Sequence, residues 1–279
     1  MDSALDLPSP NEALSLPHIR AQLIRLEDTV LFHLIERAQF PLNSTIYQSG
    51  AIPIDDGTAD LGLSFMDWVL RSQEQLQAKI RRYQSPDEYP FFPDAIKDVQ
   101  LVLPALKYPE VLYANDVCVT TDLKSRYVTS ILPNVCKVNA GGKERAEAQE
   151  NYGSAATADV NCLQSLSRRI HFGKFVAESK FQQETDRFVK LIKAEDRQGI
   201  DDAITNSAVE KQVLERLKKK AEMYGADPNL VGESGGAGTG VRKIEGEAVV
   251  AMYRDHVIPL TKEVEVEYLM QRLRGTQWE

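Results

Sequence analysis

The stretch "SLSRRIHFGKFVAESKF", residues 165–181, decides the fold class because it predicts a long amphipathic helix with charges beside its apolar face. Arg169 and Lys180 are eleven residues apart. At about 100° per residue their side chains point in almost the same direction, roughly 16 Å apart along the axis. Gly173 and Val176 lie between them, and Glu178 is predicted on the opposite, solvent-facing side. The adjacent apolar stripe consists of Leu163, Leu166, Ile170, Ala177 and Phe181.

Two cations in this position allow two interpretations. They can be snorkelling side chains whose charged heads reach water while their stems cover apolar surface. They can instead bracket a cavity with a floor of small residues. The helix alone does not decide between a structural and a functional role.

Composition limits the classes of function. The chain has 279 residues, 43% of them hydrophobic, which is enough for a large core in one or two domains. A formal net charge of −8 without a basic block excludes nucleic-acid binding through a charged surface. Three cysteines without a CxxC pair, and four scattered histidines, predict no metal site and a reducing, intracellular setting.

No targeting or membrane segment is expected. The N-terminal residues "MDSALDLPSPNEALS" lack the basic, apolar and small-residue regions of a signal peptide. No apolar run approaches the ~18–20 residues that span a bilayer. We therefore expect a cytoplasmic protein with no membrane partner.

Helical periodicity dominates the rest of the chain, and no βαβ alternation is present. The expected helices cover residues 17–40, 64–83, 157–183, 186–196, 199–224 and 245–273, with the last broken or bent at Pro259. Residues 96–138 are predicted to be mostly helical, and 41–62 and 85–94 to be loops. The glycine-rich residues 228–242 are predicted to be a flexible linker. They contain neither GxGxxG nor GxxxxGK[ST], so the sequence does not predict a phosphate loop there. The expected fold is all-α.

Three further helices carry polar residues on or beside their apolar faces. Arg20 borders the apolar face of the first helix, and Glu265 lies within the apolar arc of the last, one turn after Thr261. Asn206 and Glu210 continue the apolar stripe of a fourth helix toward its N-terminus. A bare carboxylate is costly to bury, so such a group is paired or protonated. If these seven polar residues converge, they suit a small dianionic ligand and a reaction that depends on positioning and electrostatics.

Long and unusual strings link the sequence to a known family. They are "HIRAQLIRLEDTVLFHLIERAQF", "IRRYQSPDEYPFFPD", "NYGSAATADVNCLQSLSRRIHFGKFVAESKF", "ITNSAVEKQVLERLKKKAEMYG" and "VIPLTKEVEVEYL". In these strings the chain closely resembles the eukaryotic, all-helical chorismate mutases of fungi and plants. The resemblance covers nearly the whole chain. It implies one all-α domain over residues 1–279, with about ten or more helices and 228–242 as a linker, and a homodimer.

The resemblance also implies the reaction, which is the rearrangement of chorismate to prephenate in phenylalanine and tyrosine biosynthesis, without a cofactor. Arg20 and Arg169 are expected to bind the substrate carboxylates, and Lys180 and Glu265 to face the ether oxygen. Asn206, Glu210 and Thr261 are expected to hold the ring hydroxyl and the remaining carboxylate.

Regulation is a further implication of the resemblance. Tyrosine is expected to inhibit and tryptophan to activate, at a shared site near the dimer interface. The residues that match this site are Arg81, Arg82, Asn151, Gly153, Ser154 and Thr157. Glu150 and the glycine-rich residues 229–242 depart from the family's pattern, and this bears on the strength of the allosteric response. The alternative hypothesis is a catalytically silent helical protein that binds an aromatic metabolite or a protein partner.

Overall fold

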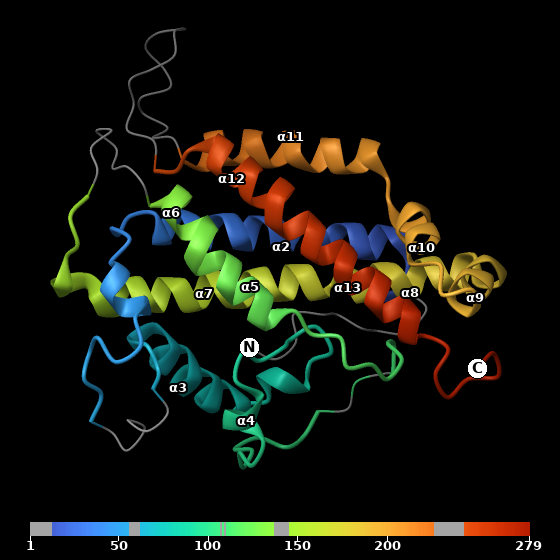
Figure 1. Ribbon diagram of the computed structural model, residues 1–279, viewed down its shortest axis with the longest axis horizontal. Coiled ribbons are helices and arrows are strands. Elements are labelled where there is room, and N and C mark those ends of the chain that lie inside the picture. The colour runs from blue at the N-terminus through green and yellow to red at the C-terminus, as the bar shows by residue number, and fades with distance from the viewer. Residues whose placement is uncertain (1–12, 56–61, 107, 109, 137–144, 226–242) are drawn as a thin grey trace, which may run out of the picture.

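The computed structural model describes residues 13–55, 62–106, 108, 110–136, 145–225 and 243–279. Within these ranges all regular elements are helices, which confirms the predicted all-α class. The predicted linker 228–242 lies outside the described residues. Two long helices, α2 (Leu16–Arg37) and α7 (Tyr152–His171), pack side by side through the centre of the molecule (Figure 1).

Other helices surround this pair. On one side α3 (Phe65–Lys79) packs against α7, and on the other α11 (Ser207–Tyr224) packs against α12 (Gly246–Met252). The chain of α12, a π-helical turn Tyr253–Val257 and α13 (Ile258–Gln271) crosses the central helices obliquely (Figure 1). Three shorter helices follow α7 in the chain and lie together at one end of the molecule (Figure 1): α8 (Gly173–Gln183), α9 (Thr185–Lys193) and α10 (Arg197–Ile204). α13 packs against both α8 and α10.

Several predicted boundaries are wrong for local reasons. The predicted helix 157–183 begins earlier, at Tyr152, and is interrupted at Phe172 between α7 and α8. The predicted helix 199–224 is two helices, because Thr205 and Asn206 are not helical. The Asn206 side chain accepts a hydrogen bond from the Val209 amide at 3.1 Å and so caps α11.

The prediction that 96–138 is mostly helical is wrong for its first half. A short helix, α4 (Pro93–Ile96), begins at the end of the predicted loop 85–94, and the described residues between 97 and 119 contain no helix. Helix appears only in α5 (Thr120–Arg126), a π-helical turn Tyr127–Ile131 and α6 (Leu132–Val135).

The last helix was predicted to be broken or bent at Pro259. It is not broken, since it continues from Gly246 to Gln271 through the π-helical turn. Pro133 follows the other π-helical turn at the same spacing. A proline in a helix cannot donate to the carbonyl four residues earlier, and its ring clashes with that carbonyl. A π-helical turn shifts the hydrogen-bond ladder by one residue just before each proline. The helix therefore accommodates the proline without ending.

The prediction that Glu178 faces solvent is wrong, because its side chain is fully buried. Its carboxylate accepts from Arg272 Nε at 2.6 Å, from Arg272 Nη2 at 3.0 Å and from the Tyr268 hydroxyl at 2.7 Å. The Arg272 guanidinium also lies between the rings of Tyr113 and Phe181. This buried ion pair fixes α8 to the end of α13 and so sets how the faces of the two helices meet.

Candidate active site

The site forms where α7, α8 and α13 meet. Gly173 opens α8, and a Cβ atom at this position would lie 3.0 Å from Thr261 Cγ2 and 3.1 Å from Glu265 Cγ. The backbone of α8 therefore approaches α13 at the two polar residues that the sequence pattern singled out on that helix. Arg169 on α7 and Lys180 on α8 lie close enough to lower the pKa of Glu265. The structure thus brings Arg169, Lys180, Thr261 and Glu265 together.

Glu265 is the electrostatic centre of this cluster. Its side chain is buried, with 8% exposed, and burial raises its pKa to about 7. Lys180, Arg169 and Lys262 oppose the rise because they stabilise the carboxylate, whereas Asp201 adds to it. Near neutral pH a substantial fraction of Glu265 is therefore protonated and can donate a hydrogen bond.

Arg169 offers hydrogen-bond donors that no described residue uses. It is 7% exposed, and its Nε and Nη1 atoms are buried without a hydrogen-bond partner in the described part of the chain. Buried polar groups are normally satisfied, so unused donors on a buried guanidinium indicate a place for a ligand. A carboxylate matches the fork of a guanidinium.

Other polar groups of the site are held by nearby protein atoms. The Lys180 ammonium donates to the carbonyl of Ile204, the last residue of α10. The Thr261 hydroxyl donates to the Val257 carbonyl at 2.7 Å, within its own helix. Glu210 on α11 forms an ion pair with Lys262 on α13 at 2.8 Å.

Two predicted residues lie at the edge of the cluster. Asn206 is exposed and caps α11 through the Val209 amide, one turn before Glu210. Arg20 is exposed on α2, a helix that packs against α8. The structure gives Arg20 no hydrogen bond or ion pair to another described residue. Its guanidinium therefore stays available to a ligand on a helix that contacts α8.

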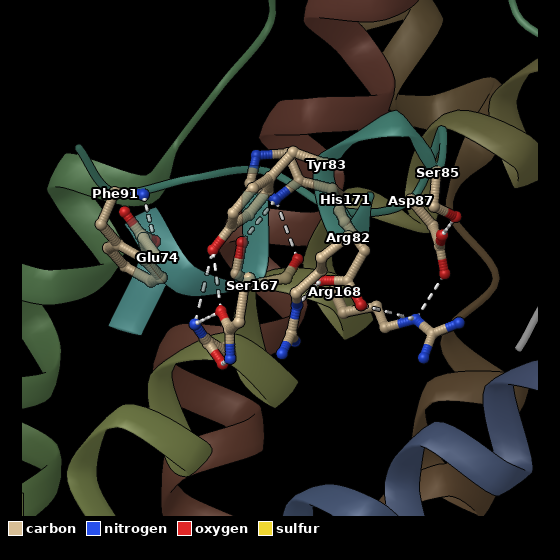
Figure 2. Close-up of polar contacts among 12 residues, drawn as sticks. Glu74, Arg82, Tyr83, Ser85, Asp87, Phe91, Ser167, Arg168 and His171 are labelled. Carbon is tan, nitrogen blue, oxygen red and sulfur yellow. Dashed lines mark hydrogen bonds and ion pairs between the residues drawn. The ribbon is translucent and has the colours of Figure 1, made fainter. Parts of the chain in front are cut away.

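The predicted effector residues fall into two groups. Arg82 forms an ion pair with Glu88 at 3.1 Å, and its neighbour Arg81 has a left-handed backbone (φ 74°) and donates to the Pro104 carbonyl at 2.9 Å. Arg82 and Arg168 border a hollow of about 210 Å³. In Figure 2, the Arg168 side chain points toward Asp87.

The second group lies at the start of α7. Gly153, Ser154 and Thr157 line a more open hollow of about 540 Å³. Asn151 is not among the residues that line either hollow, and its side-chain oxygen accepts a hydrogen bond from Asn43 Nδ2 at 2.6 Å. The two hollows share only two lining residues, His33 and Asn161. Arg82 therefore lines one hollow, and Gly153, Ser154 and Thr157 line its neighbour.

Polar contacts that the sequence pattern did not reveal hold residues 82–92 in place. Arg168 forms ion pairs with Asp87 and Glu88, and the Glu74 carboxylate accepts the amides of Phe91 and Phe92 at 2.8 and 2.9 Å (Figure 2). These partners are far apart in sequence, so no local pattern could have indicated them. The segment was expected only as a proline-bounded loop.

Lys174 was also missed. It is 1% exposed and donates to the Tyr89 hydroxyl, the Asn115 side chain and the Val117 carbonyl at 2.9, 2.7 and 2.6 Å. Burial lowers its pKa to about 8. It fixes two irregular segments to the first turn of α8, directly beside Gly173.

Two findings bear on metals and membranes. No group of three or more histidine, cysteine or acidic residues in the described ranges could hold a metal ion. No helix among the described residues has the length and apolar character needed to cross a bilayer.

Comparison with known proteins identifies the family. The protein-family model described as chorismate mutase type II matches residues 151–266. A chorismate mutase of Emericella nidulans is 59% identical over 279 residues, covering 100% of both chains. The structure of a Candida albicans chorismate mutase in complex with L-Trp superposes with a TM-score of 0.87 at 41% identity, covering 98% of this chain and 97% of that one. AtCM1, a chorismate mutase with tyrosine in its allosteric site, gives a TM-score of 0.78 at 37% identity, covering 94% and 98%. The chain therefore belongs to the chorismate mutase family.

Proposed function

We propose that the cluster around Glu265 catalyses the rearrangement of chorismate to prephenate, the isomerase reaction of the family to which the chain belongs. One observation carries this proposal: a buried carboxyl group with a pKa of about 7 is faced by Arg169 and Lys180. Chorismate carries two carboxylates and an enolpyruvyl ether. The cluster therefore supplies positive charge for the substrate and two donors for the oxygen of the breaking bond.

The reaction needs no covalent intermediate, since bond breaking and bond formation are concerted. Holding the substrate in a compact, reactive conformer lowers the barrier. Donors aimed at the ether oxygen lower it further, because negative charge grows there as the C–O bond breaks. Arg169 and Arg20 bind the carboxylates, and Lys180 exchanges the Ile204 carbonyl for the ether oxygen. Protonated Glu265 is the second donor, and Asn206, Glu210 and Thr261 hold the ring hydroxyl and the remaining carboxylate.

Regulation by L-tyrosine and L-tryptophan is part of the proposal. It is supported by the relatives solved with L-Trp bound and with tyrosine in an allosteric site. An amino acid presents a carboxylate to Arg81 or Arg82, and an ammonium and backbone to the start of α7. Because one chain holds these two groups in neighbouring hollows, a partner subunit would supply the missing half.

A homodimer fits an exposed apolar patch beside Arg81. The patch combines α3 with residues 101–103, which are tied together by a hydrogen bond from the Val102 amide to the Lys79 carbonyl at 2.9 Å. Val102 is 73% exposed and Leu76 62% exposed. Contiguous exposed apolar residues mark interaction surfaces. The remaining members of the patch are Ile80, Leu101 and Leu103. A cytoplasmic location completes the proposal.

The decisive experiment follows the loss of chorismate and the appearance of prephenate with purified protein and no added cofactor or metal. Turnover is expected, together with tight binding of a bicyclic mimic of the transition state. Binding of the mimic without turnover would instead support the alternative, a catalytically silent helical protein that binds a metabolite or a partner.

A further inference from the structure

Lys262 connects two proposed substrate-binding elements. It lies on α13 between Thr261 and Glu265, and its ammonium is 2.8 Å from the Glu210 carboxylate on α11. The two side chains are 29% and 31% exposed, so the pair lies at the edge of the cluster and not in bulk solvent. Lys262 also lines a hollow of about 410 Å³ between α10 and α13, together with Asp201.

Lys262 also faces Glu265. The two residues are three positions apart on one helix, a spacing that makes their side chains neighbours. The charged groups that act on Glu265 come from four helices: Arg169 on α7, Lys180 on α8, Asp201 on α10 and Lys262 on α13. The three cations lower the pKa of Glu265 and Asp201 raises it, so Lys262 is part of a balance of opposing charges.

We propose that Lys262 is a positioning residue of the active site, which holds the Glu210 carboxylate toward the substrate and acts on Glu265 from the neighbouring turn of α13. The inference rests on the proposed function and adds a residue to it. Lys262 acts through the two glutamates and does not itself contact the reacting atoms.

Removal of the ammonium has two expected effects. Glu210 loses the partner that orients it, so KM for chorismate rises by about two- to five-fold, the range typical of a partly exposed ion pair. Glu265 loses one of three cations that stabilise its charged form, so its pKa rises. Activity that requires protonated Glu265 is lost as pH climbs through this pKa, so the alkaline limb of the pH profile moves to higher pH.

The test compares Lys262→Met with Lys262→Arg, which keeps the charge. The matched control is Lys211→Met, which removes the same charge from an exposed residue next to Glu210 on α11. kcat and KM are measured for each protein from about pH 5 to pH 9, and circular dichroism checks the fold. Glu210→Gln alone and combined with Lys262→Met gives a double-mutant cycle for KM.

The expected result is a higher KM and a shifted alkaline limb for Lys262→Met, near wild-type behaviour for Lys262→Arg and Lys211→Met, and a non-additive cycle. A KM that matches the Lys211→Met control would overturn the role toward Glu210, and an unshifted limb would overturn the role toward Glu265. A loss of kcat as large as that of Lys180→Ala would also overturn the inference, since Lys262 would then contact the reacting atoms. Absence of chorismate turnover in the wild type would refute the proposed function itself, which keeps the two failures distinct.

Discussion

Gly173 and Thr261 lie so close that a Cβ atom on the glycine would be 3.2 Å from the Thr261 carbonyl oxygen and 3.0 Å from Cγ2 of the same residue. The contact includes backbone, which cannot rotate away. Any larger residue at 173 therefore pushes α8 from α13 by a few tenths of an ångström, and these are the helices that carry Lys180 and Glu265.

We predict that Gly173→Ala lowers kcat by about three- to ten-fold, because small misplacements of catalytic groups are costly. The control is Gly246→Ala, which also substitutes the first residue of a helix but meets its nearest atom at 3.6 Å. Steady-state kinetics of both variants decide the matter. Equal activity of the two would show that the approach of α8 to α13 does not limit turnover.

Arg169 and Lys180 are expected to be indispensable for chemistry and dispensable for folding. Removing one preorganised donor commonly lowers kcat by about 10²–10³. We predict losses of this size for Arg169→Ala and Lys180→Ala, with a cooperative unfolding transition retained, and no loss for Lys190→Ala, an exposed residue of α9. Turnover that stays unchanged in either variant would remove that residue from the site and favour the snorkelling interpretation.

The buried pair of Glu178 and Arg272 makes a prediction about stability. Both side chains are almost fully buried, so Arg272→Leu leaves a carboxylate without its counter-ion and is expected to cost about 3–5 kcal/mol of unfolding free energy. Arg254→Leu, at an arginine that is 59% exposed, should cost little. Urea denaturation measures both. The double variant Glu178→Leu with Arg272→Leu should recover part of the loss, and no recovery would mean that packing rather than charge dominates there.

Periodicity within a single helix was enough to single out polar residues of the candidate site. Helical spacing alone marked Glu265 and Arg169 as polar residues near an apolar face, and the structure brings them together. Periodicity could not predict the environment of a residue whose partner is distant in sequence. Glu178 was predicted to face solvent, but its partner, Arg272, lies 94 residues away in the chain.

Helix capping and irregular structure are a second reason why parts of the fold could not be predicted from the sequence. The break between α10 and α11 depends on one side-chain cap at Asn206, which competes with an otherwise continuous helical pattern. The described residues between 97 and 119 follow a path set by distant groups such as Lys174 and Tyr268, which donate hydrogen bonds to it or accept them from it. No local propensity in that segment encodes such partners.

The effector site gives a prediction for regulation. Arg81→Ala, Arg82→Ala and Thr157→Ala should each weaken inhibition by tyrosine while basal turnover stays near that of the wild type. The reason is that these side chains lie outside the Glu265 cluster, in or beside the two hollows near the start of α7 and residues 82–88. Calorimetric titration with tyrosine, alongside the assay, separates lost binding from lost coupling. Arg187→Ala, at an exposed residue of α9, is the control. Full inhibition in all three variants would place the effector elsewhere.

Glu265 makes the sharpest prediction, because an ionised carboxylate cannot donate a hydrogen bond and would repel the negative charge that grows on the ether oxygen. Burial raises its pKa to about 7, so the donor form dominates below that pH and disappears as pH climbs through it. We therefore expect wild-type kcat/KM to be highest at mildly acidic pH and to fall on the alkaline side. Glutamine has nearly the same shape and donates at any pH, so Glu265→Gln should flatten the profile and keep substantial activity at and above neutral pH. The measurement is kcat/KM from about pH 4 to pH 9 for both proteins. Profiles that fall in parallel would assign the titration to another group and remove the donor role from Glu265.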